Sequence, residues 1–378
     1  MSTANINRAM LSWARERLGQ TVADFAAKMN QPEDKITAWE SGAKKLTFIQ
    51  AMRFAEKSYI PFGYLFLQKP PQDHLPIPDL RTVGNNGVPE LSAELFDLIK
   101  LMIERQSWYK EYIQNNLLEP CLAVGRKSID SSVKNIVEDI RKFLKVAPHP
   151  TRGDWEEYYR DLVKRIESVG ILVMRQSHLG HYTRPLKVEE FRGFAIVDKM
   201  APVIFVNQAD APGARLFTLI HELCHVWIGQ SGISDGAATT NRQEEILCNA
   251  VSAEFLVPEI EFKNLWQHNI DDWQKNLTIL EGHFHVSKWV LARRALTLKF
   301  ISNEEYEIFI RKLIASYKNR EKKGGPSYWT TKNSQISQNF SKAVVEQAIN
   351  GQILLREAST LLDVKPYNIK KYARELGI

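Results

Sequence analysis

Apolar side chains recur at helical spacing in the first seventy residues, in short segments separated by turn signals. Gly19, Thr21, Asn30 and Pro32 are the residues that end or cap these segments. The segments predict helices over 6–18, 21–29, 32–40, 48–57 and 61–67. Three short helices within about 35 residues, joined by tight turns, predict a helix-turn-helix bundle at the N-terminus.

The pattern changes twice farther along the chain. Residues 90–168 keep apolar positions at helical spacing and predict a helical subdomain. From Gly170, short β-branched runs between turn signals predict three strands, and helical spacing then returns. The strands are expected over 171–174, 191–197 and 203–206, and the later helices over 211–257, 266–283 and 287–299.

Proline and glycine mark the domain boundaries. Four prolines in residues 69–78 prevent a helix from continuing there, and Gly324-Gly325-Pro326 indicates a second break. The chain shows no repeat of fixed period. We expect a helix-turn-helix domain over 1–69, a Pro-rich linker over 70–89, a helical subdomain over 90–168, a mixed core domain over 169–300 and a basic helical C-terminal region over 301–378.

Composition indicates a globular protein. The chain has 378 residues, 44% hydrophobic and 25% charged, which fits two to three folded domains and excludes a disordered or collagen-like protein. It contains no run of about 18 apolar residues, and the N-terminus lacks the pattern of a secretory signal. The three cysteines, Cys121, Cys224 and Cys248, form no CxxC pair and are expected to be small buried hydrophobes. We therefore predict a soluble cytoplasmic protein without a membrane partner.

The net charge of +6 is unevenly distributed. Residues 311–378 contain 13 Lys or Arg against 5 Asp or Glu, whereas the middle of the chain is slightly acidic. In this tail the pattern predicts a helix, Gly351, a second helix, and a basic helix with Lys370, Lys371 and Arg374 exposed. A second helix-turn-helix-like unit that meets nucleic acid and a plain docking pair of helices fit this pattern equally well.

The motif with the clearest chemistry is His221-Glu-Leu-Cys-His225. Two histidines four residues apart lie on one face of a helix, about 6 Å apart, which allows both imidazoles to bind one Zn²⁺. The H-E-x-x-H pattern is typical of metalloproteases, in which the glutamate, here Glu222, is the general base. Apolar residues flank the motif on both sides, so a buried helix is expected, and an unpartnered buried His, Glu and His would be costly. Ordinary core histidines remain the alternative.

A third metal ligand is expected about twenty residues later. Glu245 leads an apolar helical segment and shares a helix face with Asn249, Ser252 and Ala253, side chains small or polar enough to line a site. We predict Glu245 as the ligand and Asn249 as the acceptor that orients a zinc-bound histidine, with Glu244 as the alternative ligand. Zn²⁺ would then activate a water molecule for attack on a peptide bond, with Glu222 moving the proton.

Several candidates exist for the group that stabilises the oxyanion in such a reaction. They are His178, His181, Tyr182, His283 and His285, and the sequence selects none of them.

The combination of segments resembles the ImmA/IrrE family of zinc metallopeptidases, in particular members with an N-terminal XRE-type helix-turn-helix. The resemblance rests on Phe191-Arg-Gly-Phe-Ala-Ile196, Val203-Ile-Phe-Val-Asn207, residues 215–225 and 245–258, Trp39-Glu-Ser-Gly42 and Ile77-Pro-Asp-Leu-Arg81. It implies a mainly α fold with a small β-sheet: an N-terminal helix-turn-helix bundle, an α+β zincin-like metallopeptidase core of gluzincin type over 169–300, and a helical C-terminal tail. The family pattern has an aspartate where this chain has Asn249.

The resemblance also implies a function. Such proteins cleave transcriptional repressors of stress, phage or mobile-element genes, and related fusions occur in toxin–antitoxin-like operons. The implied partner is therefore a protein substrate, a DNA-binding repressor or a cognate toxin. The other interpretation is a DNA-binding regulator or antitoxin whose peptidase-like domain senses a partner without cleaving it. The presence of Glu222, which binds no metal, favours the enzyme.

The helix-turn-helix segment is not strongly basic. Lys35, Thr37, Lys44 and Lys45 are the candidates for contacts with DNA bases and phosphates. Residues 31–40 carry three acids and one lysine, and acids close to phosphates weaken binding. The module can therefore serve DNA binding, homodimerisation or binding of another helix-turn-helix protein.

Overall fold

The computed structural model describes residues 5–71, 91–234, 242–270, 272–318 and 327–378. These divide into two compact units, the first made of residues 5–71 and 91–99, the second of residues 100 onward. The expected linker over 70–89 and the expected break at 322–326 fall almost entirely outside the described residues. No helix in the described part is long and apolar enough to cross a membrane.

The first unit is made of short helices, close to the predicted ranges. These are α1 Arg8–Glu16, α2 Val22–Met29, α3 Glu33–Ser41, α4 Phe48–Ser58 and the 3₁₀ helix η1 Phe62–Phe66. Thr21 and Thr47 form capping boxes at the starts of α2 and α4, and Asn30 ends α2 in the left-handed conformation. The helices bury an apolar core around Phe25, Trp39 and Phe54. An ion pair between Arg15 and Glu40, at 2.8 Å, links α1 to α3.

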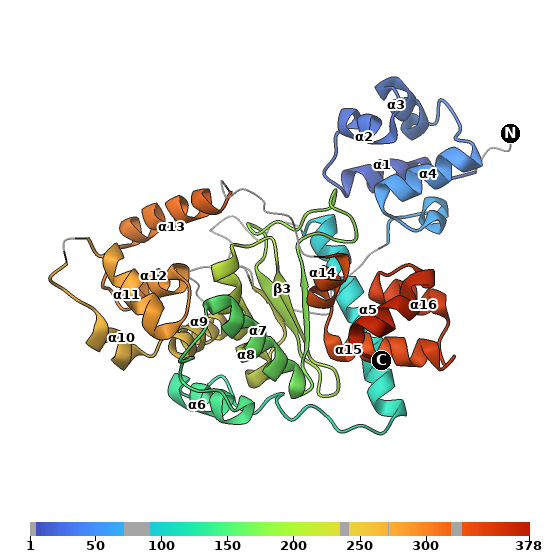
Figure 1. The fold of residues 1–378 in the computed structure, drawn as a ribbon. Coiled ribbons are helices and arrows are strands. Elements are labelled where there is room, and N and C mark those ends of the chain that lie inside the picture. Colours follow the sequence, from blue (N-terminus) through green and yellow to red (C-terminus); the bar gives the residue numbers. More distant parts are fainter. Residues whose placement is uncertain (1–4, 72–90, 235–241, 271, 319–326) are drawn as a thin grey trace. The chain divides into compact units, whose positions relative to one another are not determined.

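A small mixed sheet lies at the centre of the second unit (Figure 1). Its strands are β1 Leu172–Gln176, β2 Gly193–Ile196, β3 Val203–Asn207 and β4 Gly232–Ser234, in the order β1-β3-β2-β4. β1 and β3 are parallel, with Leu172 opposite Val203, and the other pairs are antiparallel. β4 was absent from the sequence prediction because three residues show no period.

One helix packs on this sheet and a second packs on that helix, and together they form the site described below. α8 Pro212–Ile228 packs on β2 and β3, and α9 Gln243–Leu256 packs on α8. Helices were expected over 211–257, and α8 and α9 lie in this range, but the strand between them was not expected: Gly229 ends α8 in the left-handed conformation (φ 74°) and β4 follows. Nearly every side chain of α8 is buried, as its apolar sequence predicted.

The remaining helices of this unit follow the predicted regions only in part. They are α5 Ala93–Asn115, which begins in the first unit, α6 Val133–Leu144, α7 Trp155–Ser168, α10 Glu259–Leu265, α11 Gln274–Phe284, α12 Lys288–Thr297 and α13 Asn303–Lys318. Residues 116–132 form turns, so the predicted subdomain is not helical throughout. The predicted helix over 266–283 was wrong at its start, because Trp266 instead ends α10.

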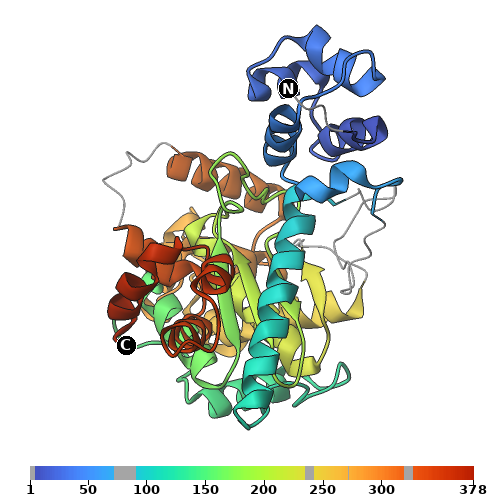
Figure 2. The same ribbon diagram turned by 90° about the vertical axis from the view of Figure 1, so that its right-hand side faces the viewer.

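The C-terminal helices pack against β1 and the second half of α5. They are α14 Tyr328–Gln335, α15 Gln338–Ile349, α16 Leu355–Leu362, the 3₁₀ helix η2 Pro366–Asn368 and α17 Ile369–Leu376. Figure 2 shows them grouped beside the sheet. Arg105 of α5 donates to the carbonyl of Leu361 at 2.8 Å. Lys370, Lys371 and Arg374 are exposed, as predicted. The described residues thus form a mainly helical protein with a four-stranded sheet, which confirms the predicted class in outline.

Candidate metal centre and catalytic site

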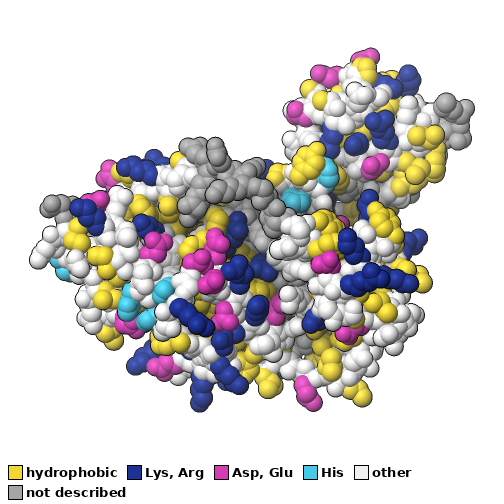
Figure 3. Space-filling view, viewed as in Figure 1, with side chains coloured by type: hydrophobic (Ala, Val, Ile, Leu, Met, Phe, Trp, Pro, Cys, Tyr) yellow, Lys and Arg dark blue, Asp and Glu magenta, His cyan; other side chains and the backbone are white. Residues whose placement is uncertain are grey.

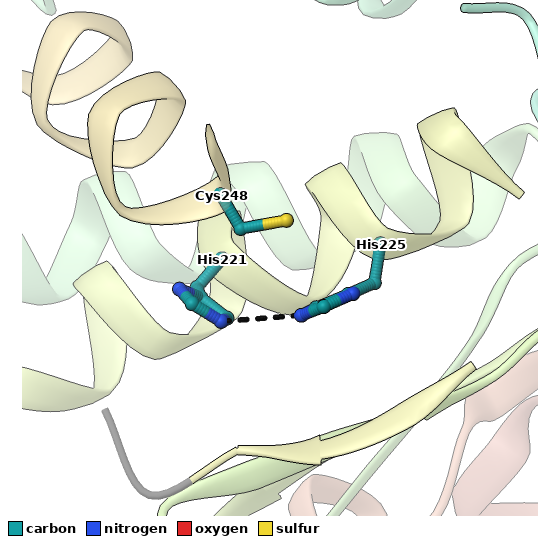
Figure 4. Close-up of side chains that lie close together, drawn as sticks. All are labelled: His221, His225 and Cys248. Atoms are coloured by element: carbon teal, nitrogen blue, oxygen red, sulfur yellow. Dashed lines mark hydrogen bonds between the residues drawn. The ribbon is translucent and has the colours of Figure 1, made fainter. Parts of the chain in front are cut away.

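The two histidines of α8 meet at one point inside the second unit. His221 and His225 are buried, and their Nε2 atoms lie 3.3 Å apart. Figure 4 shows the two rings pointing toward each other from successive turns of the helix. The spacing predicted this arrangement, since residues four apart on a helix lie one above the other.

Glu245 contacts both histidines, and the three side chains are of types that can bind a metal. Its Oε2 lies 3.1 Å from Nε2 of His221, and its Oε1 lies 3.2 Å from Nε2 of His225. Bonds of about 2.0–2.1 Å at tetrahedral angles place zinc ligand atoms about 3.3 Å apart, close to all three separations. The alternative Glu244 is next to Glu245 on α9, but among the described residues it is Glu245 that contacts both histidines.

Two further side chains reach this cluster, and neither was among the predicted site residues. The hydroxyl of Ser234 donates to Oε1 of Glu245 at 3.2 Å and lies 3.5 Å from Nε2 of His225. The Sγ of Cys248 lies within 4.8 Å of both imidazoles (Figure 4). Cys248 was detectable in principle because it is three residues after Glu245 on a helix. Ser234 was not, because β4 was not predicted.

The predicted role of Asn249 is not supported by its contacts. Its Oδ1 accepts a hydrogen bond from Nη2 of Arg293 at 3.5 Å. Among the described residues, the Nδ1 atoms of His221 and His225 have no hydrogen-bond partner. The structure therefore does not contain the expected bond from a histidine to Asn249 among the described residues, and the role predicted for Asn249 stays a prediction.

Glu222 is buried beside this cluster without a partner. Its side chain is 0% exposed, and neither carboxylate oxygen forms a hydrogen bond with the described residues. Burial, together with the negative charge of Glu245, raises the pKa of Glu222 well above its ordinary value. A charged carboxylate in such a place is costly unless a proton or a cation accompanies it.

The strand β2 leaves room for Glu222 only because residue 193 is glycine. A Cβ on Gly193 would lie 2.8 Å from Oε1 of Glu222, 2.7 Å from Cγ2 of Thr218 and 2.8 Å from the carbonyl oxygen of Phe205. The backbone of β2 therefore approaches the carboxylate directly, and any larger residue would displace one of these neighbours.

The ionisation of the ligands follows from burial and proximity. Burial lowers the pKa of His225 despite the hydrogen bond to Glu245, which favours the neutral imidazole that a metal requires. Burial opposes ionisation of Glu245, but the charges and hydrogen bonds of His221 and His225 outweigh it and hold the pKa of this carboxyl well below its ordinary value. Ionised Glu245 and neutral His225 are the forms in which these groups bind a metal.

The comparison with known families agrees with this geometry. Residues 166–296 match the model of the IrrE N-terminal-like domain, Peptidase_M78. The match includes β1 to β4, α8, α9 and α11, and it supports a peptidase of the ImmA/IrrE family for this region, in which metal dependence is typical. Residues 336–375 match a domain of unknown function, DUF8813, and neither match includes residues 1–165. No curated protein matches the chain.

The four residues of the first unit that were predicted to contact DNA differ in exposure. Thr37, Lys44 and Lys45 are exposed. Lys35 is half-buried, with its ammonium bonded to Gln31 and 5.4 Å from the centre of the Trp39 ring. Three of the four candidates are therefore accessible to a partner, and Lys35 has contacts within its own unit.

Proposed function

We propose that the second unit is a zinc-dependent endopeptidase. The observation that carries this proposal is the meeting of His221, His225 and Glu245 beside Glu222, in a region that matches the IrrE N-terminal-like domain. The two Nε2 atoms lie 3.3 Å apart, and each lies 3.1–3.2 Å from one of the two carboxylate oxygens of Glu245, which supports a shared metal ion.

A bound zinc ion explains the close approach of these three side chains better than protons alone. Each Nε2 faces a carboxylate oxygen, and two neutral imidazoles that present lone pairs there would be repelled by it. A divalent cation would satisfy all three side chains at once. Among the side chains near the pair, Glu245 is a better third ligand than Cys248, because its oxygens lie 3.1 and 3.2 Å from the two imidazoles and burial raises the pKa of the Cys248 thiol.

The chain's own residues then have separate tasks. A zinc ion held by His221, His225 and Glu245 would polarise the scissile carbonyl and acidify the attacking water. Glu222 accepts the proton of that water and donates it to the leaving nitrogen as the C–N bond breaks. Ser234 holds the carboxylate of Glu245 in place through its hydroxyl.

We also propose, from the family resemblance, that the substrate is a DNA-binding repressor or a cognate toxin, in regulation of stress, phage or mobile-element genes. The terminal modules would supply recognition. The basic residues exposed on α17 and the exposed Lys44 and Lys45 provide surfaces for such a partner or for DNA.

The test combines metal content with cleavage of a random peptide library followed by mass spectrometry. The wild-type chain should retain zinc and cleave the library. The variant His221→Ala should lose both properties, and Glu222→Gln should keep zinc but lose cleavage. Glu244→Gln is the matched control, since it changes the neighbouring carboxylate and should keep both. A Glu222→Gln protein that cleaves as fast as the wild type would contradict the proposal.

The second candidate function is a DNA-binding regulator that binds a partner without cleaving it. It is favoured by the exposed Lys44-Lys45 pair in the first unit. Binding of duplex DNA that weakens as salt increases, and that is lost in the double variant Lys44→Ala and Lys45→Ala, would support it. This outcome is independent of the peptidase test.

A further inference from the structure

A second cluster of metal-binding side chains lies at the surface of the second unit, away from the first. His149 precedes α7, Glu261 lies on α10, and His283 lies in the last turn of α11. One oxygen of Glu261, Oε2, is 3.2 Å from Nε2 of His149 and 3.1 Å from Nε2 of His283. The two imidazole rings are 4.6 Å apart between centres. A group of histidines is visible on this side of the molecule in Figure 3.

The hydrogen bonding of His149 leaves the lone pair of one ring nitrogen facing a carboxylate. Its Nδ1 lies 3.2 Å from the carbonyl oxygen of Pro150, which can only accept, so this nitrogen carries a proton. In the neutral ring, Nε2 is then a bare lone pair that faces the carboxylate of Glu261. Two lone pairs at this distance repel unless a proton or a metal ion lies between them.

The carboxylate has few other means of neutralisation. Among the described residues, the ion pairs of Glu261 are both with histidine, and the neighbouring Lys263 pairs with Glu259 at 2.5 Å. The negative charge of Glu261 favours the charged form of Arg141, but Nη2 of Arg141 donates its hydrogen bonds to the carbonyls of Phe255 and Pro148. Among the described residues, therefore, no lysine or arginine that pairs with Glu261 would compete with a cation bound by the cluster.

The spacing and the access suit zinc. Separations of 3.1 and 3.2 Å are close to the roughly 3.3 Å expected between ligands of a tetrahedral zinc ion. The three side chains are 21%, 38% and 39% exposed for His149, Glu261 and His283, so a metal can enter and water can take the fourth position. Two imidazoles with one carboxylate are ligands that zinc accepts readily.

We propose that His149, Glu261 and His283 form a second zinc site with a structural role. It joins the segment before α7 to α10 and α11. α10 follows directly after α9, which carries Glu245 in its first turn, and Arg141 of α6 holds Phe255 at the other end of α9. The second ion thus fixes the far end of the helix that provides the third ligand of the buried site.

The test is the zinc stoichiometry of the full-length chain, measured by equilibrium dialysis against excess zinc in a buffer without chelators. Wild type should bind two ions, and His283→Asn should bind one. The matched control is His285→Asn, which changes a neighbouring histidine outside the cluster. Its ring bonds the carbonyl of Gly153, and asparagine tolerates its left-handed backbone (φ 52°), so two ions should remain.

The variants also separate this proposal from the peptidase proposal. His221→Ala should lose one ion and keep the ion that His283→Asn loses. If the buried site holds no zinc, the wild type binds one ion, and His283→Asn alone removes it.

Equal stoichiometry in wild type and a folded His283→Asn protein would overturn the second site and indicate only scattered binding to surface histidines. Circular dichroism checks the fold, and Glu261→Gln replaces His283→Asn if that variant does not fold. As a second readout, zinc should raise the melting temperature of the His221→Ala protein but not of the His221→Ala, His283→Asn double variant.

Discussion

The two histidine–carboxylate clusters use the same chemical groups in opposite surroundings. In the buried cluster, His221, His225 and Glu245 are 1%, 0% and 2% exposed, whereas the side chains at the surface are 21–39% exposed. The N···O separations are 3.1 and 3.2 Å in both. Ligand geometry alone therefore does not distinguish a catalytic from a structural site.

The two clusters differ in the residues that surround them. The buried cluster has Glu222, a carboxylate without a hydrogen-bond partner among the described residues, and a strand that approaches it at Gly193. The surface cluster lies beside a hollow of about 400 Å³ that His149 and charged side chains such as Arg152 and Asp161 line. Catalysis needs a group able to move a proton in a place closed to bulk water, and only the first cluster has one.

The largest expected effect is on the rate of peptide hydrolysis, which should respond differently to changes at the two clusters. Glu222→Gln should slow peptide hydrolysis by about 1,000-fold, the scale of a lost general base, because an amide cannot accept the water proton. His283→Asn should reduce the rate far less in zinc-loaded enzyme, because it leaves Glu222 and the three buried ligands in place. Rates on a peptide found in the library screen measure both, and equal losses in the two variants would break the distinction.

The identity of the third buried ligand is the next test. Glu245→Gln should weaken zinc binding by more than the roughly 100-fold that loss of an outer-shell partner can cost, since it removes a negative ligand 3.1 Å from His221. Cys248→Ser should change it little, because the thiol stays protonated. Competition with a coloured zinc chelator gives both affinities. Stronger loss in Cys248→Ser would assign the cysteine, rather than the glutamate, as the ligand.

A methyl group added beside each cluster should change the free energy of unfolding in opposite directions. Gly193→Ala forces a methyl group to within 2.8 Å of the Phe205 carbonyl, and should lower the free energy of unfolding by about 2 kcal/mol. Gly282→Ala, next to His283 on α11, meets no atom within 4 Å and should raise it by about 0.5 kcal/mol. Thermal melts measure both, and a neutral Gly193→Ala would show that β2 can move away from Glu222.

The last comparison concerns ion pairs near each cluster, where we expect a smaller loss than for Gly193→Ala. Asp139 accepts hydrogen bonds from Arg126 at 2.7 Å and from the ring of Trp227, two residues after His225, at 2.9 Å. The bond from Arg126, with that from Trp227, lowers the pKa of Asp139 below its ordinary value despite partial burial. Asp139→Asn should therefore reduce stability by about 1 kcal/mol at neutral pH.

The pH dependence of that effect has a definite sign. Because the folded pKa of Asp139 lies below the unfolded value of about 3.9, the stabilisation is full above that pH and disappears as pH falls through the folded pKa. Urea melts at several pH values should show the variant approaching the wild type in acid. Asp161→Asn is the control beside the surface cluster, since its exposed pair with Arg165 should contribute almost nothing. A loss for Asp139→Asn that does not change with pH would contradict this explanation.

The buried site was largely predictable, and the surface site was not. His221 and His225 come from one helix at a spacing that sequence displays directly, and Glu245 follows in an acidic helix start. Ser234 lies on a strand of three residues, too short for a period to appear. His149, Glu261 and His283 come from three separate segments, so only the tertiary fold brings them together.

Helix existence was easier to predict than continuity. Helices were expected over 211–257 and α8 and α9 lie there, but Gly229 and β4 separate them. Asn249 shares the helix of Glu245, as expected, but its amide lies near Arg293 of α12, a contact that no local pattern encodes. Side-chain direction depends on the neighbouring element, which the sequence of one helix does not contain.

The most direct test of the central claim is a crystal of the zinc-loaded chain with diffraction measured on both sides of the zinc absorption edge. The account predicts an anomalous peak about 2.0–2.1 Å from Nε2 of His221 and of His225 and in contact with the carboxylate of Glu245. A fully loaded crystal with no peak between these three side chains would contradict it.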